Sequence, residues 1–213
     1  MMIRAVVFDM DGVLVNSEPK YLEQLLGFFH CNGADADDAF FHALVGSSYD
    51  YTYQKCIEKM KVDWSIKEFT EKLDKYVEEH PFRYDEVLNP GVKEILCWLK
   101  KEGYKTAIAS SSWLYQIEEM VNACGLQDYF DVLLSGEMFE ESKPNPEIYL
   151  TAAKKLGVDP SECVAVEDST YGIAAGNAAG MRVIAYADEQ FGIDQSKAYA
   201  KIHSMDEVKK HVK

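Results

Sequence analysis

Apolar and polar residues follow three different patterns along the chain, and each pattern predicts a different kind of structure. Residues 2–8 are mostly apolar and finish in Val7 and Phe8, which is typical of a buried strand. Residues 17–80 repeat apolar residues at the spacing of amphipathic helices and contain no convincing strand. From Val87 onward, short apolar runs alternate with helical patterns, which predicts strand and helix in turn.

The helical stretch predicts four amphipathic helices, enough to bury a small core of their own as a helical bundle. In the first helix Leu22, Leu25, Leu26 and Phe29 stand at i, i+3, i+4 and i+7, so one face is apolar. Pro81 ends the stretch, because a proline disfavours helix in the residue before it. By the same spacing, the four helices are placed near residues 22–29, 41–45, 53–60 and 66–77, with Gly46 closing the second.

The alternating part predicts a parallel sheet with helices on both faces. The strand at residues 2–8 belongs to this sheet, because a lone strand ahead of a helical bundle would have no partner. The fold class is therefore α/β, a doubly wound parallel sheet with an inserted α-helical bundle. The predicted strands are 104–109, 130–134, 163–166 and 182–186, and the predicted helices are 91–99, 114–121, 146–156, 171–179 and 205–212, the last with Ser204 as candidate N-cap.

The chain crosses between the sheet and the bundle twice, and these crossings define two domains. We expect residues 1–15 and 82–213 to form the sheet domain, and residues 16–81 to form the inserted helical domain. Two neighbouring crossings make a natural hinge between the domains.

Composition limits the partners and the location of the protein. Asp and Glu outnumber Lys and Arg by 36 to 22, a net charge of −14, which argues against nonspecific binding to nucleic acid or anionic membranes. An anionic substrate would therefore need a cation, backbone N–H groups or a well-placed lysine. The five cysteines include no CxxC pair, which favours free thiols in a reducing compartment. The N-terminus lacks a signal pattern and no apolar run nears ~18 residues, so we expect a cytoplasmic protein. As a separate expectation, the protein is a monomer.

Two acidic residues directly follow the first strand. Asp9 and Asp11 are two apart, and Gly12 permits a sharp turn after them. One interpretation is an ordinary Asp-Gly turn with both carboxylates in solvent. The other places them at the carboxyl end of the strand, where open α/β sheets bind ligands. There the acids would repel unless a divalent cation separates them or one is protonated, so Asp9 could be metal ligand and nucleophile, and Asp11 acid and base.

Three serines follow a later strand and should meet the first two acids at the same edge of the sheet. Ser110 comes first after the strand and precedes a helix N-terminus, whose N–H groups suit an anion, so we expect Ser110 to contact phosphate. Ser111 and Ser112 are equally well explained as hydroxyl N-caps of the next helix.

An acidic pair and a lysine complete the candidate site. Glu167 and Asp168 follow another apolar strand, either as an N-cap pair or as ligands at the edge that already holds two acids. Three or four carboxylates together would repel strongly, and a hard oxygen-seeking ion such as Mg²⁺ resolves that repulsion. Lys143 lies in a Lys-Pro-Asn-Pro loop. A lone loop lysine is normally solvated, but the prolines can hold this one inward, where its ammonium offsets the carboxylates and a phosphate.

These residues resemble the haloacid dehalogenase-like hydrolase superfamily. Its four motifs are matched in order, and together they are far more specific than any one alone. The resemblance implies a Rossmann-like catalytic core, and the insertion is similar to the helical cap of the subgroup that includes phosphoglycolate phosphatase and β-phosphoglucomutase. The matching residues are Asp9-Met10-Asp11-Gly12-Val13, the strand-end Ser110, Lys143 before a proline, and Val166-Glu167-Asp168-Ser169.

The resemblance also implies a mechanism and a role for each residue. Asp9 would attack phosphorus and become an aspartyl phosphate, while Asp11 would protonate the leaving oxygen and then activate water. Mg²⁺ would be bound by carboxylates and by the backbone carbonyl of Asp11, with Glu167 acting directly or through water. Phosphoryl transfer needs such alignment and charge neutralisation more than elaborate covalent chemistry. The implied metal set is Asp9, Asp11, Glu167 and Asp168, and the implied phosphate-binding pair is Ser110 and Lys143.

The expected function is a Mg²⁺-dependent phosphatase acting on a small phosphorylated metabolite. The alternative is a mutase that moves phosphate between positions of a sugar phosphate. In the resembled mutases a cap histidine restrains the acid/base, and an arginine follows a glycine in the cap. The corresponding positions here hold Tyr21 and an arginine-free stretch at residues 46–49, which favours the phosphatase.

Two further alternatives are less favoured. The resembled dehalogenases work without metal and lack the second acid, which Asp11 supplies here. A phosphate-binding module without catalysis would have no use for a complete set of catalytic residues and a closable cap. The cap would select the substrate, although its aromatic residues are also explained as helix surface and core: Tyr49, Tyr51, Tyr53 and Trp64.

Overall fold

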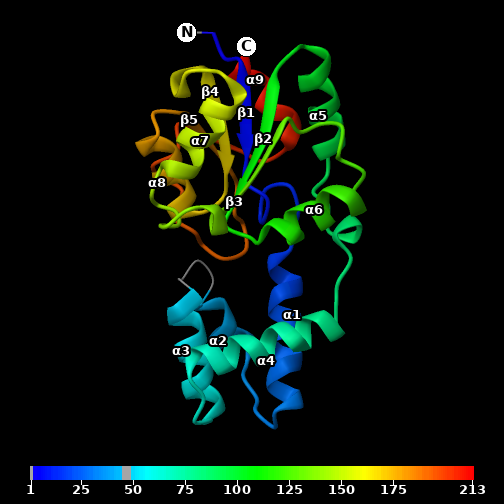
Figure 1. Cartoon of the computed structure of the whole chain (residues 1–213), viewed down its shortest axis with the longest axis vertical. Helices are drawn as coiled ribbons and strands as arrows, with labels where there is room; N and C mark the ends of the chain where they lie inside the picture. The colour runs from blue at the N-terminus through cyan, green and yellow to red at the C-terminus, as the bar shows by residue number, and fades with distance from the viewer. Residues whose placement is uncertain (1, 45–48) are drawn as a thin grey trace. The chain divides into compact units, whose positions relative to one another are not determined.

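The computed structural model describes residues 2–44 and 49–213, and it separates into two compact units (Figure 1). The first unit combines Met1–Asn16 with Arg83–Lys213, and the second is Ser17–Phe82. The second predicted helix, placed near residues 41–45 with Gly46 closing it, instead begins after the Asp37 N-cap and ends at His42, so its predicted position is wrong. The arginine-free stretch at residues 46–49 lies on positions or side chains outside the described part and stays a prediction.

Six strands of the first unit form one parallel sheet, in the order β3-β2-β1-β4-β5-β6. β1 lies between β2 and β4, and the strand order reverses there, at the place where open α/β sheets form a ligand crevice. The predicted doubly wound parallel sheet is confirmed. The strands are β1 Ala5–Phe8, β2 Lys105–Ser110, β3 Val132–Ser135, β4 Cys163–Glu167, β5 Arg182–Tyr186 and β6 Ala200–Ile202.

The sixth strand is not predicted by the sequence pattern. β6 has three residues, and only Ile202 among them is fully buried, so no alternation is visible. Its place is fixed by tertiary contacts, since it pairs with β5 and the Ala187 N–H donates to the Ile202 carbonyl at 2.8 Å.

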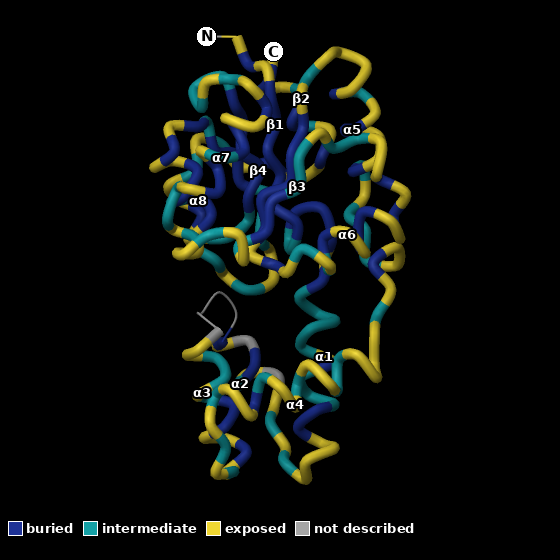
Figure 2. Tube along the Cα trace, viewed as in Figure 1, coloured by how far each residue is buried: buried dark blue, intermediate teal, exposed yellow. Residues whose placement is uncertain are grey.

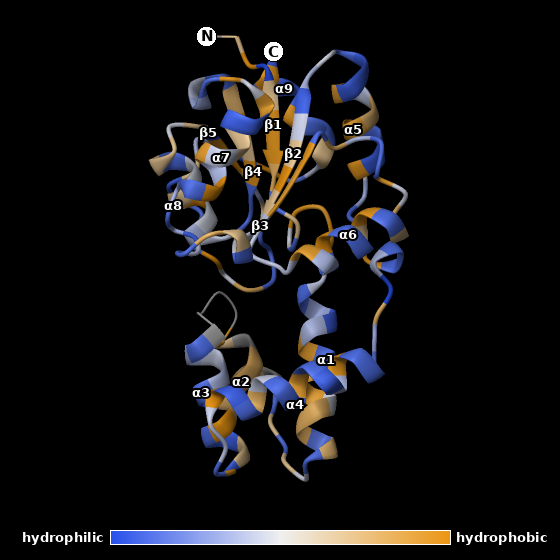
Figure 3. Ribbon diagram, in the orientation of Figure 1, coloured by the Kyte–Doolittle hydropathy of each residue, from blue (hydrophilic) through white to orange (hydrophobic). Residues whose placement is uncertain are grey.

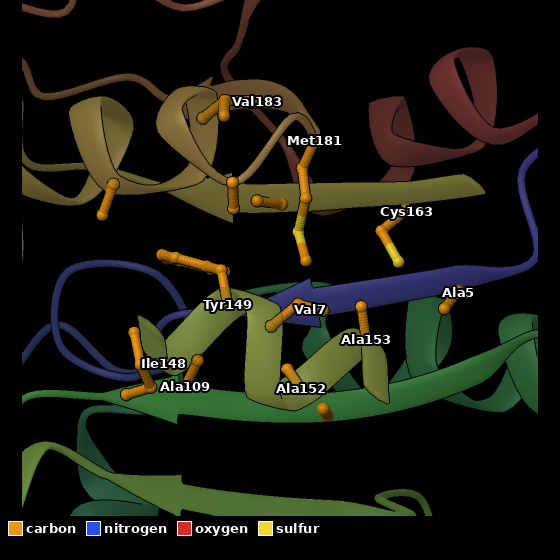
Figure 4. Close-up of a cluster of buried hydrophobic side chains, with 14 of the residues drawn as sticks. Ala5, Val7, Ala109, Ile148, Tyr149, Ala152, Ala153, Cys163, Met181 and Val183 are labelled. Carbon is orange, nitrogen blue, oxygen red and sulfur yellow. The ribbon is translucent and has the colours of Figure 1, made fainter. Parts of the chain in front are cut away.

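The sheet interior is buried and apolar on both faces (Figures 2 and 3). Successive side chains of a strand point to opposite faces, so Ala5 and Val7 share one face of β1. That face packs against α7 and α8, whose small and aliphatic residues include Ala152 and Ala153 (Figure 4). Because the strands are parallel and in register, all their carboxyl ends reach the same edge.

Helices cover both faces of the sheet, with α7 and α8 on one side and α5, α6 and α9 on the other (Figure 1). The predicted helix at residues 205–212 is instead a 3-10 turn followed by a short α-helix, and Ser204 makes no side-chain capping hydrogen bond. The elements are α5 Val92–Lys101, α6 Leu114–Ala123, α7 Glu147–Leu156, α8 Thr170–Ala178 and α9 Lys209–Val212, with 3-10 turns at Tyr84–Glu86, Gly136–Met138, Pro160–Glu162 and Met205–Val208.

The second unit consists of the four expected helices around an aromatic core. Phe28 packs edge-on against Phe69 with ring centroids 5.5 Å apart, and both are buried. Trp64 and Tyr53 pack against this core, whereas Tyr51 is exposed, in line with their interpretation as core and surface. The helices are α1 Glu18–Cys31, α2 Asp38–His42, α3 Tyr49–Met60 and α4 Ile66–Glu79.

All five cysteines are free thiols, as their spacing indicates. Cys56, Cys124 and Cys163 are buried, and burial raises the pKa of both Cys56 and Cys163 to about 12, so these two stay protonated and unreactive. Within residues 2–44 and 49–213, none of the helices has the length and apolar character needed to cross a membrane.

Candidate active site

Asp9 continues β1 by one residue into the edge of the sheet. Its N–H donates to the Val166 carbonyl at 2.9 Å, so the ladder to β4 extends past the strand itself. Its side chain is only 12% exposed, which excludes the interpretation of an Asp-Gly turn with both carboxylates in solvent. Burial raises the pKa of the Asp9 carboxyl to about 7, opposed by the Lys143 ammonium and assisted by the charge of Glu167.

Lys143 points into the site from the loop before α7. Its Nζ donates to Asp9 Oδ1 at 2.9 Å, to the Ala109 carbonyl at 2.9 Å and to Glu167 Oε1 at 2.6 Å. Burial lowers the pKa of this ammonium, but the carboxylates of Asp9 and Glu167 outweigh that effect and hold the pKa well above its ordinary value. The solvated-lysine interpretation is therefore wrong. All three ammonium protons are in use, so a phosphoryl oxygen must take the place of one of these acceptors.

Glu167 is fully buried at the end of β4 and accepts hydrogen bonds at both oxygens. Oε1 accepts from Lys143 and from the Tyr149 hydroxyl of α7, the latter at 2.6 Å. Oε2 accepts from the Asp168 N–H at 3.2 Å, and from the N–H and hydroxyl of Ser169 at 3.3 and 3.1 Å. Burial and the charge of Glu167 raise the pKa of Tyr149 well above its ordinary value, so Tyr149 remains a donor. Five donors thus hold one buried carboxylate.

The first turn of α8 lies directly against Glu167. A Cβ added at Gly172 would stand 1.8 Å from Glu167 Oε1, so only glycine fits there. The N-cap of α8 is Ser169, whose hydroxyl accepts from the Gly172 N–H at 3.0 Å. The interpretation of Glu167 and Asp168 as the N-cap pair is therefore wrong, because the capping position falls one residue later.

Asp9, Glu167 and Asp168 form a compact acidic cluster. Each offers one carboxylate oxygen, and the three oxygens lie within 4.8 Å of one another. Gly12 makes this approach possible: its φ is +76°, and a Cβ there would stand 2.0 Å from Asp168 Oδ2. An all-oxygen, acidic donor set suits a hard cation such as Mg²⁺ rather than a metal that prefers nitrogen or sulfur.

Asp11 is held by a serine from the loop after β2. The Ser112 hydroxyl donates to Asp11 Oδ2 at 2.6 Å, and the Ser112 N–H donates to Ser110 Oγ at 3.0 Å. Ser135 fixes this loop by donating to the Ser112 carbonyl at 2.7 Å. The N-cap position of α6 is Trp113, so the interpretation of Ser111 and Ser112 as its hydroxyl caps is wrong.

The structure thus brings the predicted site residues to one edge of the sheet and adds two residues to which the sequence gave no role in the site, Tyr149 and Ser112. In the sequence, Tyr149 stands at helical spacing with Ala152, Ala153 and Leu156, and this pattern indicates only a core position. Ser112 was noticed, but its contact to Asp11 depends on how two loops far apart in sequence meet.

The fold and this arrangement of acids and lysine are those of a hydrolase family. Residues 6–186 match the family model described as "Haloacid dehalogenase-like hydrolase". The chain belongs to this family, and the resemblance drawn from the four motifs is confirmed.

The chain is also similar to individual proteins of known name. Hexitol phosphatase B of Escherichia coli strain K12 is 35% identical over 185 residues, which cover 85% of this chain and 82% of that protein. A phosphorylated carbohydrates phosphatase of Thermotoga maritima is 32% identical over 184 residues, covering 85% and 84%. The crystal structure of a β-phosphoglucomutase from Clostridium difficile matches with a TM-score of 0.79 at 27% identity, covering 97% of this chain and 93% of that one.

Proposed function

We propose that the protein is a Mg²⁺-dependent phosphatase that hydrolyses a small phosphorylated metabolite through an aspartyl-phosphate intermediate. The observation that carries the proposal is the group of Asp9, Lys143 and Glu167, whose side chains are buried, together with the half-buried Asp168, at the carboxyl edge of the sheet. The similarity to hexitol and carbohydrate phosphatases favours a phosphorylated sugar or sugar alcohol as substrate.

The metal would be held by the carboxylates of Asp9 and Asp168 and by the backbone carbonyl of Asp11. Glu167 already accepts five hydrogen bonds, so we assign it a contact through water and an anchoring role rather than a direct bond. Bound Mg²⁺ would neutralise charge on the phosphoryl oxygens.

In the first half-reaction, an Asp9 carboxylate oxygen forms a bond to phosphorus as the ester P–O bond breaks. Asp11 gives its proton to the leaving oxygen, so the alcohol departs neutral. Ser110 and the Lys143 ammonium bind phosphoryl oxygens, with Lys143 exchanging one of its present acceptors for phosphate.

In the second half-reaction, Asp11 removes a proton from water as the water oxygen attacks phosphorus. The bond from phosphorus to Asp9 breaks, and inorganic phosphate leaves. Ser112 supports this step because its hydroxyl holds the Asp11 carboxylate at 2.6 Å. The catalytic chemistry is thereby assigned to the sheet unit alone.

The helical unit would act as the cap that selects the substrate. It is inserted in the chain directly after the loop that carries Asp9 and Asp11, and it contributes no member of the acidic cluster. We therefore expect substitutions within Ser17–Phe82 to change which phosphate ester is used, with the chemical step intact.

A sugar-phosphate mutase is the second candidate, favoured by the match to the β-phosphoglucomutase structure. A mutase must keep its phospho-enzyme from water until the second hydroxyl arrives, which requires a residue that restrains Asp11. The position expected for this residue holds Tyr21, whose ring packs edge-on against Phe82 within the helical unit at 5.4 Å. A tyrosine is uncharged near neutral pH, so it is poorly suited to that restraint.

The test is a panel of sugar and sugar-alcohol phosphates, including hexitol phosphates and β-glucose 1-phosphate, assayed with Mg²⁺ for inorganic phosphate. Phosphate release is expected, abolished by a chelator and restored by added Mg²⁺. Turnover that continues in excess chelator would contradict the metal assignment. Sustained conversion of β-glucose 1-phosphate to glucose 6-phosphate, with little free phosphate, would replace the phosphatase by the mutase.

A further inference from the structure

Gln195 is a buried amide in the segment between β5 and β6, beyond residues 6–186 that the family model matches. It is 4% exposed. Its Nε2 donates to the Asp168 carbonyl at 2.6 Å and to the Tyr186 carbonyl at 2.8 Å. Its Oε1 accepts from the Asp188 N–H at 3.3 Å. One side chain therefore joins the residue that follows β4 to the last residue of β5.

The segment around Gln195 is itself well ordered by hydrogen bonds. The Asp188 carboxylate accepts three backbone N–H groups of residues 190–193, at 2.7 to 3.0 Å, which closes the first half of the segment into a turn. Two side chains of α8 hold the second half: Thr170 donates to the Asp194 carbonyl at 2.8 Å and Asn177 to the Lys197 carbonyl at 3.0 Å. These hydrogen bonds hold Gln195 in place beside Asp168. We call the segment of residues 188–197 the strap.

The contact matters because Asp168 lies beyond the end of β4, so the strand ladder does not hold its backbone in place. Its N–H donates to Glu167 Oε2, and its carbonyl accepts from Gln195, so the peptide groups on both sides of its Cα are fixed. Its carboxylate has little room, since it lies against the Cα of Gly12. A functional site tolerates displacements of only about 0.5 Å, and partners behind a metal ligand change metal affinity by ~10–100-fold.

We propose that Gln195 is a positioning residue, which sets the place of the Asp168 carboxylate for Mg²⁺ by holding the Asp168 carbonyl. The proposal rests on the proposed function, because it takes Asp168 as a metal-binding residue. It assigns a role in the site to a segment outside the matched family region, so this part of the chain adjusts metal affinity without touching the substrate.

The experiment measures Mg²⁺ binding to the metal-free full-length protein by titration calorimetry. Gln195→Met keeps the length of the side chain and removes its hydrogen bonds, so the dissociation constant should rise ~10-fold or more. Turnover at saturating Mg²⁺ should change much less than the Mg²⁺ concentration needed for half-maximal activity. Asn177→Ala is the matched control, because it removes another anchor of the same strap that does not touch Asp168; its Mg²⁺ affinity should equal that of the wild type.

Equal Mg²⁺ affinity of the wild type and Gln195→Met, with a lower melting temperature in the variant, would make Gln195 purely structural and overturn the inference. Equal weakening by Gln195→Met and Asn177→Ala would assign the effect to the strap as a whole and also overturn it. If Gln195→Met does not fold, Gln195→Asn, which draws the amide back from Asp168, is judged by the same criteria. A folded wild type that binds no Mg²⁺ would instead refute the metal assignment of the proposed function.

Discussion

The two units of the protein fill their interiors with different chemistry. The helical unit buries phenylalanines and aliphatic residues, and the buried polar side chains among its described residues are Ser17 and Gln24. The sheet unit buries ionisable groups as well, with Asp9 and Glu167 hydrogen-bonded to Lys143. The ion pairs of the helical unit, such as Lys20 with Glu23, lie at its surface.

This difference separates stability from chemistry. Burying a charge costs free energy even when it is paired, and hydrophobic residues of similar size would often be at least as stable. The sheet unit retains Asp9, Glu167 and Lys143 in its interior, which is understandable if they carry the reaction. We therefore expect substitutions in the helical core to lower stability. Replacing the buried ionisable residues of the sheet unit should instead remove activity from a protein that still folds.

The largest effect is expected for Asp9→Asn. An amide cannot form the phosphoryl intermediate, so turnover should fall on the order of 10⁴-fold or more while circular dichroism stays unchanged. Asp206→Asn, the same substitution at an exposed residue paired with Lys209, should leave turnover as it is. Near-normal turnover of Asp9→Asn would exclude the covalent mechanism.

The next largest effect is expected on the stability of the helical unit. Phe69→Ala leaves a cavity at a fully buried residue of the helical core and should lower the free energy of unfolding by about 3–5 kcal/mol in chemical denaturation. Tyr51→Ala, at an exposed position of α3, should cost far less. Mg²⁺ binding to the sheet unit should persist in both variants; its loss in Phe69→Ala alone would mean that the units are not energetically separate.

Two glycines of α8 allow a sharper test within the sheet unit. Gly172→Ala brings a methyl group against the Glu167 carboxylate, and Gly176→Ala brings one to 2.7 Å from Val183 Cγ2. Both overpack the interior and should cost about 1–3 kcal/mol of stability. Only Gly172→Ala displaces Glu167 and, through it, Lys143, so only this variant should also weaken Mg²⁺ binding and lower kcat. Equal activity of the two variants would show that Glu167 tolerates displacement.

The smallest effect is a dependence of metal binding on pH. Burial raises the pKa of Asp9 to about 7, so below pH 7 the metal-free protein carries a proton that Mg²⁺ must displace. Affinity should fall as pH drops below 7, by up to ~10-fold per unit, and level off above it. Calorimetry in two buffers of different ionisation enthalpy should detect proton release at pH 6 and little at pH 8.5. Proton release that persists in Asp9→Asn would assign the proton to another group.

Much of the site could be predicted because it follows strand ends. In a parallel sheet, Asp9, Ser110 and Glu167 must reach one edge, so their order in the sequence is enough to bring them together. The contacts of Tyr149 and Gln195 could not be predicted, because each depends on a helix or strap packing against a strand that lies elsewhere in the sequence. In the sequence, Tyr149 is indistinguishable from a core aromatic residue, and Gln195 is indistinguishable from a polar surface residue.

The errors at helix ends have a common physical cause. Several serines and acids near a helix start can all supply a capping oxygen, and the sequence does not say which backbone conformation each one takes. Ser169 rather than Glu167 caps α8, because Glu167 still belongs to β4 and its carboxylate turns toward Lys143. The short β6 and the divided C-terminal helix escape prediction because each is held by contacts with the sheet rather than by its own pattern.

The central place of β1 has a consequence for the order of events during synthesis. The ribosome makes β1 first, yet one of its two neighbours, β4, begins only at Cys163. At about 5–20 residues per second, the apolar β1 waits roughly 10–30 s for that partner. The helical unit is continuous in sequence and is complete by Phe82, so it can fold while β1 waits. A nascent chain stalled before β4 would therefore carry a folded helical unit and a β1 strand that still lacks one of its two neighbours, which makes this open edge of β1 a candidate binding segment for a chaperone.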